Sequence, residues 1–298
     1  MSAQTTAPPE EELEREALKP SKDEGDSASW GARLTLALVC IIFTIPTLGL
    51  LISSFRPRED IISSGWWTVF TGNVNFSLDN YTAVLDEGMG TAFANSLAVA
   101  VPATVIPILA AAFAAYAFAW MDFRGREFLF VIFVGLLVVP LQVAFVPLTQ
   151  LFNAVGIQSD FLKLWLAHTG FGMPLAVYIL RNYIGSLPRE VIESAKVDGA
   201  NHFATFWRLI MPLSVPALAA YAIFQFLWTW NDYLVALIFM TGGEEVVTVT
   251  LAELVGSRGQ DWHLLTAGAF ISMTVPLIVF FALQRFFVRG LTAGSVKG

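Results

Sequence analysis

The chain has 298 residues, of which 56% are hydrophobic and only 14% are charged. Soluble globular chains carry roughly 25% charged residues, so most of this surface cannot face water and a lipid bilayer is its natural solvent. One cysteine, Cys40, excludes an intramolecular disulfide, and the three histidines match no zinc spacing, so we expect no metal, no cofactor and no redox chemistry.

The formal net charge of −7 owes most to the N-terminal segment 1–32, where eight acidic residues accompany Pro8 and Pro9. The segment shows no apolar periodicity, which predicts a disordered cytoplasmic tail whose charge serves solvation. A cleaved signal peptide is not expected, because the apolar stretch that follows is too long and lacks a small-x-small exit.

Apolar stretches of about 20 residues, the length that crosses the hydrocarbon core, can be read six times along the chain. They fall near 34–54, 92–120, 128–150, 162–182, 213–240 and 264–287. The second and fifth are longer than a perpendicular span needs, which indicates tilt, a re-entrant end or a kink at Pro102 or Pro107. The sequence therefore predicts an all-α polytopic membrane protein, with six transmembrane helices in a domain over 33–289 and a cytoplasmic tail at 290–298.

The basic residues predict the orientation, because lysine and arginine are retained on the cytoplasmic face. With six spans both termini share a side, and 13 of the 17 basic residues lie on that side. The other four are Arg56, Arg58, Lys163 and Arg258. Both termini are therefore expected in the cytoplasm, with Arg56 and Arg58 in an ordered external segment.

Two external loops are expected, at about 55–90 and 241–263. The first contains Trp66, Trp67 and Phe70, and such aromatics mark either an interfacial belt or a partner site. The second is long enough to reach a docked protein.

The internal loop at 183–212 is not a simple linker. Ser186 is a candidate N-cap, Pro188 fits the first turn and Gly199 fits a helix stop, so the pattern predicts a short helix, a bend and a second helix that feeds the next span.

Residues of this short helix carry the docking hypothesis. Leu187, Val191, Ala195 and Asp198 share one row, and Ser194 and Ala195 are small enough for another backbone to approach. Glu190 and Glu193 flank that face with charge. Such a surface suits docking into a groove of a soluble partner, and the alternative is an interfacial helix that lies against lipid headgroups.

The segment resembles the EAA loop of importer permeases of the ATP-binding-cassette class, whose pattern is Glu-Ala-Ala, three residues, Gly, nine residues, Ile, one residue, Leu-Pro. Glu193, Ala195, Gly199 and Pro212 fall on pattern positions. Ser194, Leu209 and Met211 depart from it, and each change preserves size or apolarity. The Trp-Asn-Asp-Tyr run at 230–233 and the ending at 290–298 are similar to the second permease subunit of carbohydrate importers of the maltose and alpha-glucoside type.

This resemblance implies the MetI-like permease fold and a bacterial cytoplasmic-membrane location. It also implies that the EAA loop forms a coupling helix seated in a cleft of an ATPase dimer. Further implied partners are a second permease and an extracytoplasmic sugar-binding protein, whose cleft the loop around 242–260 would probe. Besides these proteins only membrane lipid is expected to bind, and no nucleic acid.

The chain contains no Gly-x-x-x-x-Gly-Lys-Ser/Thr phosphate cradle, so ATP must be hydrolysed on another subunit and the chain is expected not to be an enzyme. Mechanical movement of the short helix would then switch access across the membrane.

Polar groups inside spans are costly and therefore informative. Those considered for a sugar path are Trp228, Asn231, Asp232, Gln142 and His168. Asn231 and Asp232 serve equally well to satisfy a broken helix or to link this subunit to its partner, and the resemblance places much of the sugar contact on the other permease.

Three other functions compete with this interpretation. A permease of the same class could carry an amino acid, a peptide or phosphate. An ion-coupled secondary transporter would need an intramembrane carboxylate, for which Asp232 is the candidate. An intramembrane enzyme is disfavoured, because neither a Gly-x-Ser-x-Gly elbow nor a His-Glu-x-x-His pair is present.

Overall fold

The structure is a computed structural model, and it describes residues 29–72, 75–256 and 261–293. Residues 1–28 of the expected acidic tail lie outside the described residues, as do residues 294–298 of the expected C-terminal tail. Every regular element in the described ranges is a helix, so the predicted all-α class is confirmed.

The chain divides into two units after Leu50. Helix α2 (Trp30–Ser54) supplies the described part of the first unit, and its last turn belongs to the second. Its 25 residues are apolar between Leu34 and Leu51 and exceed the ~20 residues that a membrane crossing requires.

Three helices are long and apolar enough to cross a membrane, namely Trp30–Ser54, Asp79–Trp120 and Trp262–Gln284. Two bent helix pairs also pass this test, namely Arg126–Val138 with Leu141–Ala154, bent by 103°, and His202–Leu213 with Val215–Trp230, bent by 73°. The described residues thus contain three candidate spans, or five if each bent pair counts as one, and the number six stays a prediction. The expected stretch 162–182 lies in α9 (Asp160–Gly185), which is 26 residues long but carries Lys163 and Arg181.

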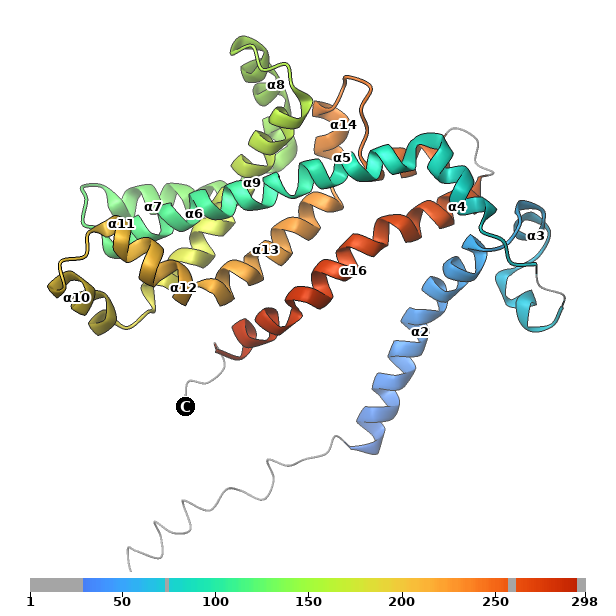
Figure 1. The fold of residues 1–298 in the computed structure, drawn as a ribbon, viewed down its shortest axis with the longest axis horizontal. Coiled ribbons are helices and arrows are strands. Elements are labelled where there is room, and N and C mark those ends of the chain that lie inside the picture. Colours follow the sequence, from blue (N-terminus) through green and yellow to red (C-terminus); the bar gives the residue numbers. More distant parts are fainter. Residues whose placement is uncertain (1–28, 73–74, 257–260, 294–298) are drawn as a thin grey trace, which may run out of the picture. The chain divides into compact units, whose positions relative to one another are not determined.

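The core of the second unit is a set of helices that pack on one another: α6 (Pro102–Trp120), α9, α13 (Val215–Trp230) and α16 (Trp262–Ala293). Figure 1 shows α6, α9 and α13 side by side. Ala111, Ala112 and Ala115 of α6 are completely buried, as is Ala176 of α9. Small residues at this crossing let the two backbones approach closely, which is how helices associate in lipid.

The second unit also contains shorter helices, apart from those of the loop between α9 and α13. They are α3 (Arg58–Ser63), η1 (Trp66–Phe70), α4 (Asp79–Val84), η2 (Leu85–Met89), α5 (Gly90–Ala100), α7 (Arg126–Gly135), η3 (Leu136–Val138), η4 (Leu141–Ala144), α8 (Phe145–Ala154), α14 (Leu234–Phe239) and α15 (Val247–Gly256). The expected span 92–120 is therefore part of a longer run that starts at α4.

Two of the expected spans are broken. The stretch 128–150 breaks at Val139 and Pro140, because proline has no N–H to continue a helix. The stretch 213–240 breaks after Trp230, and the chain resumes as α14 at Leu234.

The segment after α2 is ordered around Arg56, as predicted. The Arg56 side chain is 4% exposed, and its guanidinium donates to the carbonyls of Asp60 and Ser64 and to the hydroxyls of Ser64 and Thr68. Asn80 Nδ2 donates in turn to the carbonyls of Ser54 and Arg56 at 2.9 and 2.8 Å. A buried cation is tolerated when its donors are satisfied in this way.

A buried polar cross-link joins three of the packed helices. Gln225 of α13 is completely buried, and its Nε2 donates to the Ala103 carbonyl of α6 at 3.1 Å. The Tyr221 hydroxyl lies 2.8 Å from both Gln225 Oε1 and the Gly172 carbonyl of α9. Gly172 leaves the room for this arrangement, because a Cβ there would lie 2.7 Å from Gln225 Oε1.

Candidate functional site

The loop between α9 and α13 contains the predicted short helix, α10 (Arg189–Val197). Its N-cap is Pro188, which offers no side-chain cap, so the expectation that Ser186 caps this helix was wrong. Ser186 is instead the C-cap of α9, and its hydroxyl donates to the Tyr183 carbonyl at 2.8 Å. Helix α9 ends at Gly185, so Ser186 caps the end of α9 and is not available to cap the start of α10.

Gly199 ends α10 as predicted. Its φ of +80° places it in the left-handed region that favours glycine, and the Ala200 amide donates back to the Ala195 carbonyl at 2.9 Å. Asn201 then caps α11 (His202–Thr205), since its side chain accepts from the Ala204 amide at 2.8 Å.

The second helix of the loop leads into α13, as the sequence predicted. After α11 come a π-helical turn, η5 (Phe206–Ile210), and α12 (Met211–Leu213). The chain turns at Ser214 and enters α13. Pro212 lies exposed in α12, at the end of the EAA pattern.

One face of α10 packs on the hydrophobic core and the other face is exposed. Ile192 is 1% exposed and belongs to the hydrophobic core with Phe206 and Ile210. Val197, by contrast, is 87% exposed. The residues predicted to couple to the ATPase are called the predicted docking set, and its exposed members are Pro188, Glu190, Val191, Glu193, Ser194, Asp198, Gly199 and Pro212.

The predicted row of four residues on α10 is split by this anchoring. Leu187 and Ala195 are half-buried, with Leu187 packed against the core, whereas Val191 and Asp198 are exposed. The anchor Ile192 was not among the predicted residues, although the apolar pair Val191-Ile192 between Glu190 and Glu193 is the kind of signal that marks a buried position.

Three hydrogen bonds brace the base of the loop. Tyr116 Oη lies 2.9 Å from His202 Nδ1, and Trp120 Nε1 donates to the Ile184 carbonyl at 3.0 Å. The Tyr183 hydroxyl donates to the Leu213 carbonyl at 3.3 Å. These bonds tie α6 to α11 and to the end of α9, and the end of α9 to α12.

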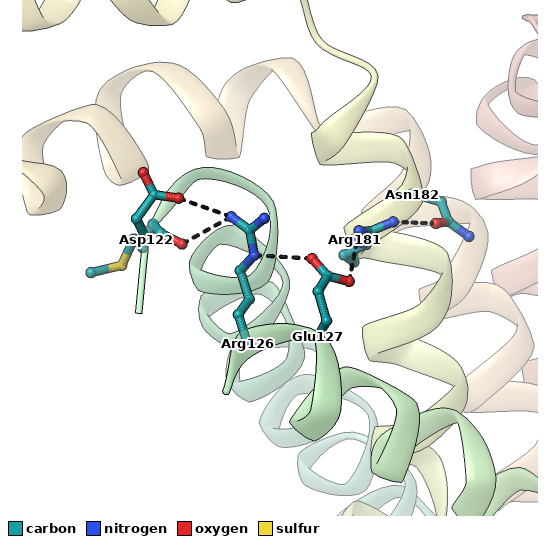
Figure 2. Close-up of polar contacts among 6 residues, drawn as sticks. Asp122, Arg126, Glu127, Arg181 and Asn182 are labelled. Atoms are coloured by element: carbon teal, nitrogen blue, oxygen red, sulfur yellow. Dashed lines mark hydrogen bonds and ion pairs between the residues drawn. The ribbon is translucent and has the colours of Figure 1, made fainter. Parts of the chain in front are cut away.

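Charged residues join the start of α7 to the end of α9 near this loop (Figure 2). Arg126 donates to Asp122 at 3.2 Å and to Glu127 at 3.1 Å, and Glu127 lies 4.0 Å from Arg181. The Arg181 guanidinium also lies 4.6 Å from the centre of the Phe130 ring. Each pair is partly exposed, so each contributes little to stability.

The five residues considered for a sugar path do not form one site. The structure brings together Trp228, His168 and Asp232: the rings of Trp228 and His168 lie 5.7 Å apart, and His168 Nε2 lies 3.8 Å from Asp232 Oδ2. Asn231 is exposed and donates to the Leu227 carbonyl of its own helix, and Gln142 is exposed in η4.

Asp232 closes the break between α13 and α14. Its Oδ2 accepts from the Ala236 amide at 3.1 Å, and its carbonyl accepts from Thr248 Oγ1 at 2.6 Å. This is the arrangement in which the carboxylate satisfies a broken helix.

A mostly apolar cavity of about 310 Å³ lies between the break at Pro140, helix α9 and helix α13. Pro140, Phe171 and Trp228 are among its lining residues. Trp228 is the member of the predicted path that lines this cavity.

Residues 103–293 match the family described as "Binding-protein-dependent transport system inner membrane component". The chain is 59% identical over 270 residues to the "Osmoprotective compounds uptake permease protein GgtD" of Synechocystis sp., with 89% of this chain and 91% of that protein covered. It is 44% identical to the "Alpha-glucoside transport system permease protein AglG" of Rhizobium meliloti, with 91% and 97% covered.

A solved structure shares the fold. It is a chain of a bacterial ABC transporter involved in the import of the acidic polysaccharide alginate, with a TM-score of 0.69 and 22% sequence identity, over 88% of this chain and 99% of that chain.

Proposed function

Because this chain belongs to the family of binding-protein-dependent transport system inner membrane components, we propose that it carries a carbohydrate across the cytoplasmic membrane. Family membership makes it the membrane-embedded permease of an ATP-binding-cassette importer, in which a separate subunit hydrolyses ATP. The carbohydrate is a di- or oligosaccharide such as an alpha-glucoside, in line with the name of one relative.

The observation that carries the coupling part of this proposal is the construction of α10. Ile192 fixes the helix to the core, while Glu190, Glu193 and Asp198 project from it. Because Ile192 packs in one core with Phe206 and Ile210 of η5, we expect displacement of α10 to be passed to the segment that leads into α13. The exposed residues of α10 mix acids with Arg189 and Lys196, so charge alone does not separate docking from the interfacial-lipid alternative, and the crosslinking test below decides between them.

The proposed assembly contains an ATPase dimer, a second permease and an extracytoplasmic sugar-binding protein. Both termini and α10 face the cytoplasm, so that α10 sits in a cleft of one ATPase. The ATPase can shift the equilibrium between inward and outward access only through contacts that differ between these two states. The contacts between α10 and the ATPase must therefore differ before and after ATP binds.

Crosslinking tests the contact directly. In a Cys40→Ser background, Val197→Cys in intact cells should crosslink to an ATP-binding subunit, because Val197 is 87% exposed at the end of α10. Thr241→Cys, in the turn before α15, is the matched exposed control and should give no such product. Absence of an ATPase adduct from Val197→Cys in an active complex would refute the coupling role.

For the route through the bundle, we assign Trp228 to the solute path, since it lines the cavity beside the Pro140 break. Asp232 bonds across the break between α13 and α14 next to it, and His168 Nε2 lies 3.8 Å from that carboxylate. Uptake by Trp228→Ala should fall more than uptake by Asn231→Ala, whose side chain is exposed and bonded to its own helix.

A second candidate solute is an osmoprotective compound, because the relative with 59% identity is named for the uptake of such compounds. Uptake of a labelled alpha-glucoside, competed by small osmoprotectants or by amino acids, separates the candidates. Competition by an amino acid alone would overturn the carbohydrate assignment.

A further inference from the structure

A carboxylate at the start of α9 holds a loop that is distant in sequence. Asp160 is the first residue of α9, and its Oδ2 accepts from the amides of Thr241 and Gly242 at 2.8 and 2.7 Å. Its Oδ1 accepts from Lys163 Nζ at 2.8 Å. The Asp160 side chain is only 10% exposed, and the bonds to its carboxylate are charge-assisted.

The loop fits this contact closely. A Cβ at Gly242 would lie 3.0 Å from Asp160 Oδ2, and the φ of Gly243 is +88°, which favours glycine. The loop is also held by α5, because Asn95 Nδ2 donates to the Glu245 carbonyl at 2.9 Å and the Val247 amide donates to Ser96 Oγ at 2.8 Å. Residues 241–247 are therefore fastened to two helices.

Helix α9 connects this fastening to α10. It runs without interruption from Asp160 to Gly185, which is about 39 Å at 1.5 Å per residue. Its other end passes through Leu187 directly into α10. Asp160 and α10 are thus attached to opposite ends of the same helix, and α6 packs along its length.

We propose that Asp160 is a positioning residue that makes the 241–247 loop move with α9, so that the state of this outer loop and the position of α10 change together. The inference rests on the proposed function, in which the loop faces the binding protein and α10 faces the ATPase. Coupling between two sites is reciprocal, and the attachment of the loop to a helix that continues to α10 gives such coupling a physical route.

The test uses the assembled importer in lipid nanodiscs, with ATPase activity measured in the absence and presence of solute-loaded binding protein. Asp160→Ala should leave the basal activity unchanged and lower the stimulation on the order of tenfold, as expected for loss of hydrogen bonds to a charged group. Asp160→Asn, which keeps an acceptor oxygen, should lose less. Asp86→Asn, an exposed acid on η2, is the control and should be stimulated like the wild type.

A second measurement reports on the attachment without transport. Hydrogen exchange of the 241–247 amides should accelerate in Asp160→Ala and in Gly242→Ala, which keeps the carboxylate but pushes it away. Unchanged exchange in both variants overturns the inference even if transport is normal, and so does wild-type stimulation of Asp160→Ala. Absence of stimulation in the wild type would instead overturn the proposed function, and the exchange result would still decide whether Asp160 holds the loop.

Discussion

At the scale of single residues, Gly172 and Gly170 provide a matched test of the buried cross-link. A Cβ at Gly172 would press on Gln225, whereas a Cβ at Gly170 meets no atom within 4 Å. We expect Gly172→Ala to destabilise the protein by about 1–3 kcal/mol, the usual cost of overpacking, and Gly170→Ala to leave it unchanged. Thermal unfolding in detergent measures the difference, and equal melting temperatures for both variants would contradict the packing described for Gln225.

Asp160 gives a prediction of pH dependence. Burial works to raise the pKa of Asp160, but the hydrogen bond from Lys163, the amides of Gly242 and Thr241 and the Lys163 charge outweigh it, so the pKa is lowered. Asp160 lines a surface hollow, and the exposed Glu244 lines it as well. A lowered pKa contributes stability that is complete above the ordinary value of about 3.9 and is lost as the pH falls through the folded value.

The melting temperature of the wild type should therefore exceed that of Asp160→Asn by a constant amount between pH 7 and 5, and the gap should close below about pH 4. Carboxylates elsewhere titrate in both proteins and cancel in the difference. A gap that stays constant down to pH 3 would show that this carboxylate is not held as described.

Sequence alone does not reveal the partners of Asp160. They are backbone amides 81 and 82 residues away, and any residue type supplies an amide. Trp228 was predicted because a tryptophan among polar groups in an apolar run is itself a signal, but its separation from Gln142 depends on how the chain bends at Pro140.

At the scale of elements, α10 was predicted well from local chemistry and less well from its packing. Gly199 stops the helix because a left-handed residue is needed there, and that requirement is visible in the sequence. The choice of Ser186 as a cap failed because α9 extends to Gly185, and the length of a buried helix is set by tertiary packing.

Gly199→Val should abolish uptake, since a β-branched residue at a φ of +80° costs roughly 1–2 kcal/mol and displaces the end of α10. Gly185→Ala is the control, because its Cβ makes an ordinary contact of 3.8 Å with Ala119. Uptake and membrane insertion are measured together, and an inserted Gly199→Val protein with normal uptake would contradict the role of the bend.

The charge on the exposed face gives a separate prediction. Glu193→Arg should also abolish uptake with insertion intact, because it reverses the charge presented to the ATPase. Lys196→Gln, on the exposed side of the same helix but outside the predicted docking set, should retain most uptake. Normal uptake by Glu193→Arg would argue against a docked α10.

At the scale of the whole chain, apolarity alone locates the spans but not their breaks. The stretch 128–150 reads as one span because it is uniformly apolar, yet the chain turns by 103° within it. Helix α9 has the opposite character, since its length suits a crossing while its charged ends weaken the apolar signal.

Labelling of single cysteines decides whether α9 crosses. In the Cys40→Ser background, Gln158→Cys before α9 should react with an impermeant maleimide from outside the cell, and Val197→Cys should react only after the membrane is opened. Labelling of both positions from the same side would show that α9 does not cross, which would leave five spans and invert the proposed position of α10 or of the outer loop.

The hydrogen bonds around Arg56 have a consequence for the synthesis and membrane insertion of the chain. Ser64, Thr68 and Asn80 all follow Arg56, so a ribosome delivers the arginine before the groups that enclose it. In the proposed orientation we therefore expect this guanidinium to cross the membrane before those groups can enclose it. Its burial then opposes a return across the bilayer, because the four neutral acceptors would first have to be given up.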